Sequence, residues 1–198
     1  MQGQIVALIV ATSFAAGLNL PATIATLGLL ERGGVVTLPS SLQLLANWWI
    51  IGASVVLFLI EMVADKIPGF DLIWNALQTF IRVPAGALLA FGATAQLSPE
   101  LQIAATLAGG TIAFLAHGGK TAARAAVTAS PEPFSNLALS FGEDVAAIGI
   151  TWLATQHPYW AAAIAICLLV AIFVFVRLVI AALRSMFRRA QTAIEGPA

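Results

Sequence analysis

The chain has 198 residues, of which 60% are hydrophobic and only 9% are charged. Soluble domains carry about a quarter charged residues, so this composition excludes a soluble globular protein and indicates a polytopic membrane protein. Lysine and arginine together number nine, as do aspartate and glutamate, so the total charge indicates neither a nucleic acid nor an acidic membrane surface as a partner. The single cysteine, Cys167, lies inside an apolar run, forms no intrachain disulfide and has no predicted role.

Apolar runs separated by breakers predict an all-α protein with six transmembrane helices of about 20 residues each. No cleaved signal peptide is expected, because the opening MQGQ carries no positive charge. We expect one transmembrane domain over residues 1–198, with halves at about 1–95 and 96–185 and a cytoplasmic tail at 186–198. The six runs cover about residues 5–30, 44–63, 71–94, 101–127, 134–156 and 159–183.

Two of the six runs contain predicted helix breaks. The sequence GLNLP, residues 17–21, interrupts the first run, because Pro21 lacks a backbone donor and its ring clashes with the preceding turn. Glycines in HGGKT, residues 117–121, interrupt the fourth run. In both halves the break is followed by a loop, a helix and a proline turn. This order predicts an inverted repeat of three helices per half, an architecture of many secondary transporters.

Lysine and arginine predict the orientation, because they concentrate in cytoplasmic loops. With six spans and a cytoplasmic N-terminus, only Arg32 would lie on the far side of the membrane. We therefore expect a multi-pass protein of the bacterial inner membrane with both termini in the cytoplasm. The residues then placed at cytoplasmic ends are Lys66, Lys120, Arg124, Arg184, Arg188 and Arg189.

Polar and ionisable residues recur at helical spacing inside the predicted spans, which places each set on one helix face. An ionisable residue deep in a span costs about 2.5–3.5 kcal/mol and is a functional candidate by default. Four sets follow this spacing: Asp71, Asn75, Gln78 and Arg82; Glu61 and Asp65; His117, Lys120 and Arg124; and Asn136, Ser140 and Glu143, with Asp144 beside the last.

Arg82 and Glu143 lie deepest in their spans, whereas Asp65, Lys66 and Asp71 flank the turn at residues 67–69 and are interpreted as salt bridges at helix ends. A guanidinium is effectively always protonated, and a buried charge without a partner costs several kcal/mol. We therefore expect Arg82 to contact at least one acid across the interface between the halves. The candidate acids are Glu61, Glu143 and Asp144.

The segment GGKT is not a phosphate-binding loop, because that motif needs a glycine where Phe114 stands, and no soluble strand precedes it. Nucleotide hydrolysis is therefore excluded. A glycine break here would instead free backbone amides at the start of a short helix, and such a helix start attracts anions.

Several longer motifs are more specific. The chain combines GLN near its start, EMVADKIPGFD with a following Trp74, TFIRVPAGALL, and AHGGKTAARAAVTASPEPFSNLALSFGEDV. In these motifs it resembles a family of bacterial integral membrane proteins catalogued only as a domain of unknown function. The resemblance covers nearly the whole chain. It implies a conserved membrane fold and no established activity, so a functional assignment depends on the residues themselves.

These features favour a small-solute or ion transporter or channel, without metal or cofactor, whose polar site lies between the two broken helices. The alternative is a structural or partner-binding membrane protein whose charges form a fold-stabilising salt-bridge network. An enzyme is not favoured, because neither HExxH nor a Gly-x-Ser-x-Gly elbow occurs. The almost uniformly apolar sixth span predicts contact with lipid and a homodimer. The predicted site consists of Asn19, Thr23, Glu61, Arg82, His117, Lys120, Arg124, Glu143 and Asp144.

Overall fold

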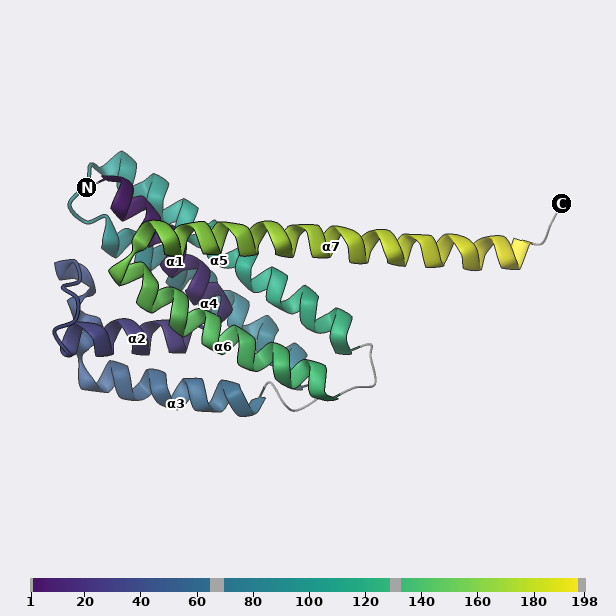
Figure 1. The fold of residues 1–198 in the computed structure, drawn as a ribbon, viewed down its shortest axis with the longest axis horizontal. Helices are drawn as coiled ribbons and strands as arrows, with labels where there is room; N and C mark the ends of the chain where they lie inside the picture. The colour runs from purple at the N-terminus through teal and green to yellow at the C-terminus, as the bar shows by residue number, and fades with distance from the viewer. Residues whose placement is uncertain (1, 65–69, 129–132, 196–198) are drawn as a thin grey trace.

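The computed structural model describes residues 2–64, 70–128 and 133–195, and in this part of the chain all regular elements are helices (Figure 1). The predicted all-α class is confirmed. Asp65, Lys66 and the turn at residues 67–69 lie outside the described residues, as do the side chains of Asp71 and Asn136. The elements are α1 (Gln2–Leu18), α2 (Leu20–Arg32), the 3-10 helix η1 (Ser40–Ala46), α3 (Trp48–Ala64), α4 (Phe70–Ala93), α5 (Pro99–Thr128), α6 (Pro133–Gln156) and α7 (Pro158–Glu195).

Among the described residues, four helices are long and apolar enough to cross a membrane, and a bent pair adds a fifth. The bent pair is η1 with α3, which meet at 66°. The expected count of six is not reached, because α1 and α2 are each too short to span the membrane. The four single spans are Trp74–Ala93, Pro99–Ala125, Leu137–Gln156 and Pro158–Ala182.

The predicted break at residues 17–21 is present, and it reverses the direction of the chain. The start of α1 lies beside the start of α7, where a side chain on Gly3 would contact Tyr159. The end of α2 packs against η1 and the start of α3, where Gly28 leaves no room for a side chain beside Leu45 and Ile51. Both contacts lie at the left end of Figure 1, whereas the α1–α2 junction lies inside the bundle. Helices α1 and α2 therefore form a hairpin that enters and leaves at the same end.

Local chemistry explains why the chain turns at this point. Asn19 has an extended backbone, with φ −149° and ψ 99°, and its side chain accepts a hydrogen bond from the amide of Ala22 at 2.9 Å. It is the N-cap of α2, a position that asparagine favours. Pro21 stands in the first turn of α2, where a missing amide costs nothing. Helix α1 ends at Leu18 because Pro21 cannot continue it.

The predicted break at HGGKT is wrong, because α5 runs without interruption from Pro99 to Thr128. Glycine inside a helix costs only about 1 kcal/mol relative to alanine, so it weakens a helix without ending it, unlike proline. Gly119 allows close packing, since any side chain there would clash with Ile172 of α7. The amides of this segment belong to the helix interior, so the expected anion-attracting helix start is also absent. The two halves thus differ at the position on which the inverted repeat depended.

Helix α1 is the central element of the bundle. Residues 11–20 are all buried, and α1 contacts α4, α5, α6 and α7. Small residues bring these helices together: Ser13 donates to the carbonyl of Gly86 at 3.3 Å, and a side chain on Gly86 or Gly109 would collide with Ala113 or Ala90. Close packing of this kind is typical of helices in membranes. It places the tip of the hairpin among the longer helices.

The two ends of the described chain lie at opposite ends of the molecule (Figure 1). Helix α7 starts near the N-terminus and projects beyond the bundle at the other end. Its 38 residues correspond to about 57 Å, nearly twice the bilayer core of about 30 Å. It is still helical at Glu195, so most of the expected tail at 186–198 belongs to α7. The expectation that both termini share one side of the membrane counted the hairpin as a crossing, and the structure does not show it.

Candidate functional site

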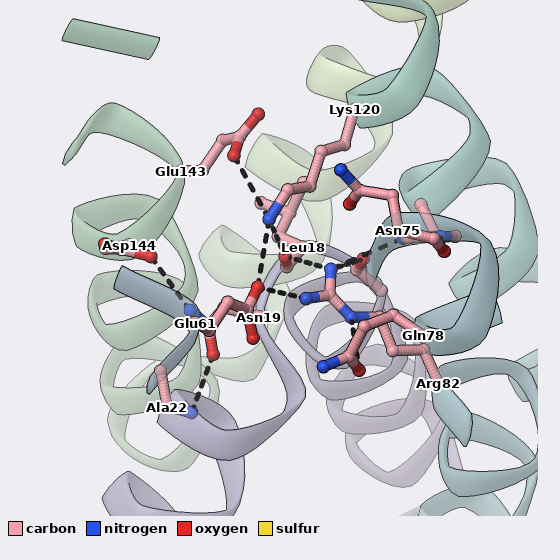
Figure 2. A network of polar contacts seen from close by, with 12 residues as sticks. Leu18, Asn19, Ala22, Glu61, Asn75, Gln78, Arg82, Lys120, Glu143 and Asp144 are labelled. Atoms are coloured by element: carbon pink, nitrogen blue, oxygen red, sulfur yellow. Dashed lines mark hydrogen bonds and ion pairs between the residues drawn. The ribbon is translucent and has the colours of Figure 1, made fainter. Parts of the chain in front are cut away.

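The tip of the hairpin meets a buried cluster of charged side chains (Figure 2). Among the side chains that the structure describes, three cations and three carboxylates, contributed by α3, α4, α5 and α6, balance each other, and no more than 8% of any of them is exposed. Asn19, Thr23 and His117 are at most 2% exposed. The structure thus brings all nine predicted site residues into the interior. The six charged members are Glu61, Arg82, Lys120, Arg124, Glu143 and Asp144.

Two cations close the open end of α1. The last carbonyl groups of a helix have no partner within it, and the helix dipole favours positive charge there. Arg82 Nη1 donates to Leu18 O at 2.5 Å and to Gly17 O at 3.1 Å. Lys120 Nζ donates to Leu18 O at 3.1 Å. The carbonyl groups that lose their helical partners where α1 ends before Pro21 are thereby hydrogen-bonded by side chains from α4 and α5.

Asn19, at the same tip, forms a hydrogen bond with α6. Its Nδ2 donates to Asp144 Oδ1 at 2.8 Å, while its Oδ1 caps α2 (Figure 2). Thr23 turns back into the hairpin, because its hydroxyl donates to Asn19 O at 2.9 Å. Thr23 therefore supports the cap, and the hydrogen bond assigned to it does not reach the charged side chains.

The charges form a continuous chain of contacts across four helices. Arg82 Nη2 donates to Glu61 Oε1, which also accepts from Lys120 Nζ at 3.1 Å. Lys120 Nζ lies 3.2 Å from Glu143 Oε2, and Arg124 Nη2 donates to that same oxygen at 2.7 Å. The order is Arg82, Glu61, Lys120, Glu143, Arg124. Lys120 is the bridge between the two carboxylates.

The expected pairing of Arg82 with an acid is confirmed for Glu61, but both residues belong to the first half of the chain. The contact between the halves is made by Lys120, whose single ammonium group forms ion pairs with both Glu61 and Glu143. A buried pair loses several kcal/mol when one partner is removed, because the other charge is left in a medium of low polarity. The network is therefore a strong constraint on the position of the hairpin tip.

His117 is held between Arg82 and the backbone of α4. Its Nδ1 lies 3.3 Å from Arg82 Nη1, and its Nε2 lies 3.0 Å from Asn75 O. A guanidinium only donates and a carbonyl only accepts, so Nδ1 is the acceptor and Nε2 carries the hydrogen. This assignment is the neutral imidazole. His117 accordingly orients Arg82 and adds no charge to the cluster.

Two carboxylate oxygens in the cluster have no hydrogen-bond donor. They are Glu61 Oε2 and Glu143 Oε1, both buried. Most buried polar atoms in proteins are satisfied, so exceptions require an explanation. In the described part of the chain, no group of three or more His, Cys, Asp or Glu side chains is placed to hold a metal ion. The free oxygens are acceptors for a group that brings its own hydrogen.

Sequence reasoning missed the backbone part of this site. The carbonyls of Gly17 and Leu18 are as much a part of it as the side chains, and the signal for them was the helix end that Pro21 requires. Gln78 was placed on the Arg82 face, and its Oε1 accepts from Arg82 Nε at 3.4 Å, but it was not included among the site residues. Asn75 on that face is also buried and positions His117.

Residues 6–178 match a protein family described as Domain of unknown function (DUF4126). The chain belongs to this family. The DUF4126 match contains the hairpin from residue 6 onward, all six charged residues of the cluster and α7 as far as residue 178, so the projecting end of α7 lies outside it. No curated protein and no solved structure matches the chain. The resemblance drawn from the sequence motifs is confirmed, and the family description adds no activity.

Proposed function

We propose that this DUF4126 protein carries a small ion or solute across a bacterial inner membrane and that the charged cluster at the hairpin tip is its binding site. One observation carries the proposal: the chain breaks at Asn19, which is fully buried. Within a membrane, backbone that leaves the helix is tolerated only where protein buries it or where it lines a water-filled cavity. Broken helices at the midplane form the substrate sites of many transporters.

The chemistry of the site supports this function. Lys120 is shared by Glu61 and Glu143, and each carboxylate keeps one oxygen without a donor. A solute that donates hydrogen bonds has acceptors on both sides of the Lys120 ammonium. Movement of Lys120 toward one of the two carboxylates would leave the negative charge of the other less neutralised. Ionisable residues at such depth mark ion and proton pathways in membrane proteins.

The orientation that we propose places the projecting end of α7 in the cytoplasm. Arg177, Arg184 and Arg188 lie along that end of α7, whereas Arg32 lies at the end that carries the N-terminus. Positive residues concentrate on the cytoplasmic side. The hairpin then opens toward the outer side of the membrane, and its tip approaches the cluster from there.

A homodimer through α7 is part of the proposal. Most residues of the spanning part of α7 are not buried, and it exposes large apolar side chains that include Phe173 and Leu178. A second copy would cover part of this surface, and lipid would cover the rest. Chemical cross-linking in native membranes should yield a dimer, and a yield of monomer alone would contradict it.

A structural role is the second candidate, because the buried cations and carboxylates that the structure describes are equal in number, and at least five of the six form ion pairs with each other. In that case the network would fix the hairpin in the bundle and would bind nothing. The two candidates differ in what happens when a pair is removed together, since a structural network is replaceable by apolar side chains.

Flux into proteoliposomes tests the transport function. Purified protein would be reconstituted and assayed with a panel of protons, alkali cations, halides and small polyols under imposed gradients. Glu61→Gln removes one carboxylate charge from the site, whereas Glu100→Gln makes the same change at an exposed position of α5. We expect flux of at least one species for the wild type and for Glu100→Gln, and its loss for Glu61→Gln. Wild-type vesicles that match protein-free vesicles for every species would overturn the proposal.

A further inference from the structure

A cavity of about 270 Å³ lies between α1, α5, α6 and α7. Almost all of its surface is apolar, and its lining includes the charged residues Lys120 and Glu143. Ligand pockets in proteins have this character, with apolar walls and a few polar groups that fix orientation. Its main apolar contacts are Phe14, Leu18, Leu139 and Ile172.

The cavity opens on the outer surface of the bundle between α6 and α7. Its rim includes Ala138 and Gly142 of α6 and Leu168 of α7, all of which are exposed. A side chain added at Gly142 would meet nothing within 4 Å, so there is open space at this point of the rim. In a membrane-spanning bundle this surface faces acyl chains. The cavity is therefore a side entrance from lipid to the charged cluster.

The polar end of the cavity offers an acceptor. An ammonium group has three donors, and Lys120 Nζ uses them on Leu18 O, Glu61 Oε1 and Glu143 Oε2. Glu143 Oε2 accepts from both Lys120 and Arg124, whereas Glu143 Oε1 has no donor. Glu143 is only 8% exposed. A group that binds at this end must bring a hydrogen to Glu143 Oε1.

The charge balance of the cluster selects among donor groups. Glu143 already has two cationic partners, and the charges of the cluster side chains that the structure describes sum to zero. A resident ammonium would leave one uncompensated positive charge in a buried site, which is costly. A hydroxyl group supplies a hydrogen without adding charge. The cavity is also near the lower limit of the volumes of small-molecule pockets, so it holds the head of a ligand and the first part of its chain.

We propose that this cavity binds an uncharged membrane amphipath with a hydroxyl head, such as a long-chain alcohol or an acylglycerol. The hydroxyl donates to Glu143 Oε1, and the chain passes Leu139 and Ile172 and leaves between α6 and α7. This inference goes beyond the proposed transport, because binding from the lipid side needs no passage across the membrane. It stands or fails on binding alone, measured without a gradient.

Photolabelling of the full-length protein in lipid nanodiscs tests the proposal. Three probes share one diazirine-bearing alkyl chain and end in a hydroxyl group, an ammonium group or a methyl group. We expect the alcohol to label residues of α6 and α7 around the cavity, about tenfold more than the hydrocarbon, as for a hydrogen bond to a charged group. Equal labelling by alcohol and hydrocarbon, or stronger labelling by the ammonium probe, would overturn the inference.

Matched glycine variants separate the cavity from the general lipid surface. Gly142→Leu places a side chain in the open space of the rim without colliding with the protein. Gly149→Leu makes the same change two turns along α6, at an exposed position with open space that does not line the cavity. Alcohol labelling should fall about tenfold in Gly142→Leu and stay at the wild-type level in Gly149→Leu. Labelling that survives in Gly142→Leu would show that the alcohol binds elsewhere and would refute the assignment.

Discussion

Arg82 donates to the carbonyl oxygen of Leu18 over 2.5 Å, and this contact joins the middle of α4 to the last residue of α1. The same guanidinium pairs with Glu61. The Arg82 side chain thus donates to a carbonyl at the end of α1 and pairs with a carboxylate of α3. The hairpin tip, the helix end and the charge network depend on one another. A substitution in any one of these three parts should therefore disturb the structure of the other two.

Removal of Arg82 tests this dependence. Arg82→Ala should lower the free energy of unfolding by about 3–5 kcal/mol, because it removes one partner of a buried ion pair. Arg32→Ala is the control: Arg32 is exposed, stacks 4.4 Å from the centre of the Trp48 ring and donates to Ala46 O. Its loss should cost about 0.5–1 kcal/mol, as for an exposed cation–π contact. Unfolding in mixed micelles, followed by circular dichroism, measures both. Equal destabilisation by the two variants would contradict the role of Arg82 at the hairpin tip.

Because α5 is uninterrupted, alanine substitutions at two neighbouring glycines, Gly118 and Gly119, should change the stability of the protein in opposite directions. A side chain at Gly118 meets nothing within 4 Å, so Gly118→Ala should stabilise the helix by about 0.5–1 kcal/mol. Gly119→Ala places a methyl group against Ile172 and should destabilise by about 1–3 kcal/mol through overpacking. Thermal unfolding of the two variants in detergent gives the comparison. A helix broken at these glycines would be harmed by both substitutions, so two shifts of the same negative sign would count against a continuous α5.

The contrast between the two expected breaks shows which features are readable from a sequence. Pro21 ends α1 through its own ring and its missing amide, and Asn19 caps α2 through a contact three residues away. Both effects are local, so the break was predictable. The role of Gly119 depends on Ile172, which is distant in the sequence. The sequence contained the glycine but no sign of its neighbour, and the break assigned there was wrong.

The candidate site shows the same limit. Helical spacing places Arg82 on a polar face, and the energy of a buried charge requires an acid nearby. These arguments restricted the candidate partners of Arg82 to three acidic residues. They did not distinguish Glu61 from Glu143, because helical spacing describes one helix and says nothing about which helix lies opposite. The reversal of α1 into α2 was likewise hidden, since a broken span and a returning hairpin have the same apolar pattern.

The membrane orientation is testable with single cysteines in a Cys167→Ser background. Gln4→Cys lies in the first turn of α1 and Ser185→Cys lies near the projecting end of α7, both at exposed positions. The ends lie on opposite sides of the molecule (Figure 1). A membrane-impermeant thiol reagent added to intact spheroplasts should label only the first, and the second should react only after lysis. Labelling of both from the same side would restore an even number of crossings and contradict the hairpin.

Removal of a whole ion pair distinguishes transport from a structural role. Arg82→Leu alone should be strongly destabilised, because Glu61 then loses its guanidinium partner. The double variant Arg82→Leu with Glu61→Leu should recover about 1–4 kcal/mol of that loss, since well-packed apolar residues replace buried ion pairs at little cost. For a transporter, flux should remain absent in the stable double variant, because the site has lost an acceptor and a cation. Stability comes from unfolding in mixed micelles, and flux comes from the proteoliposome assay. A double variant that regains both stability and wild-type flux would show that these charges only fix the fold.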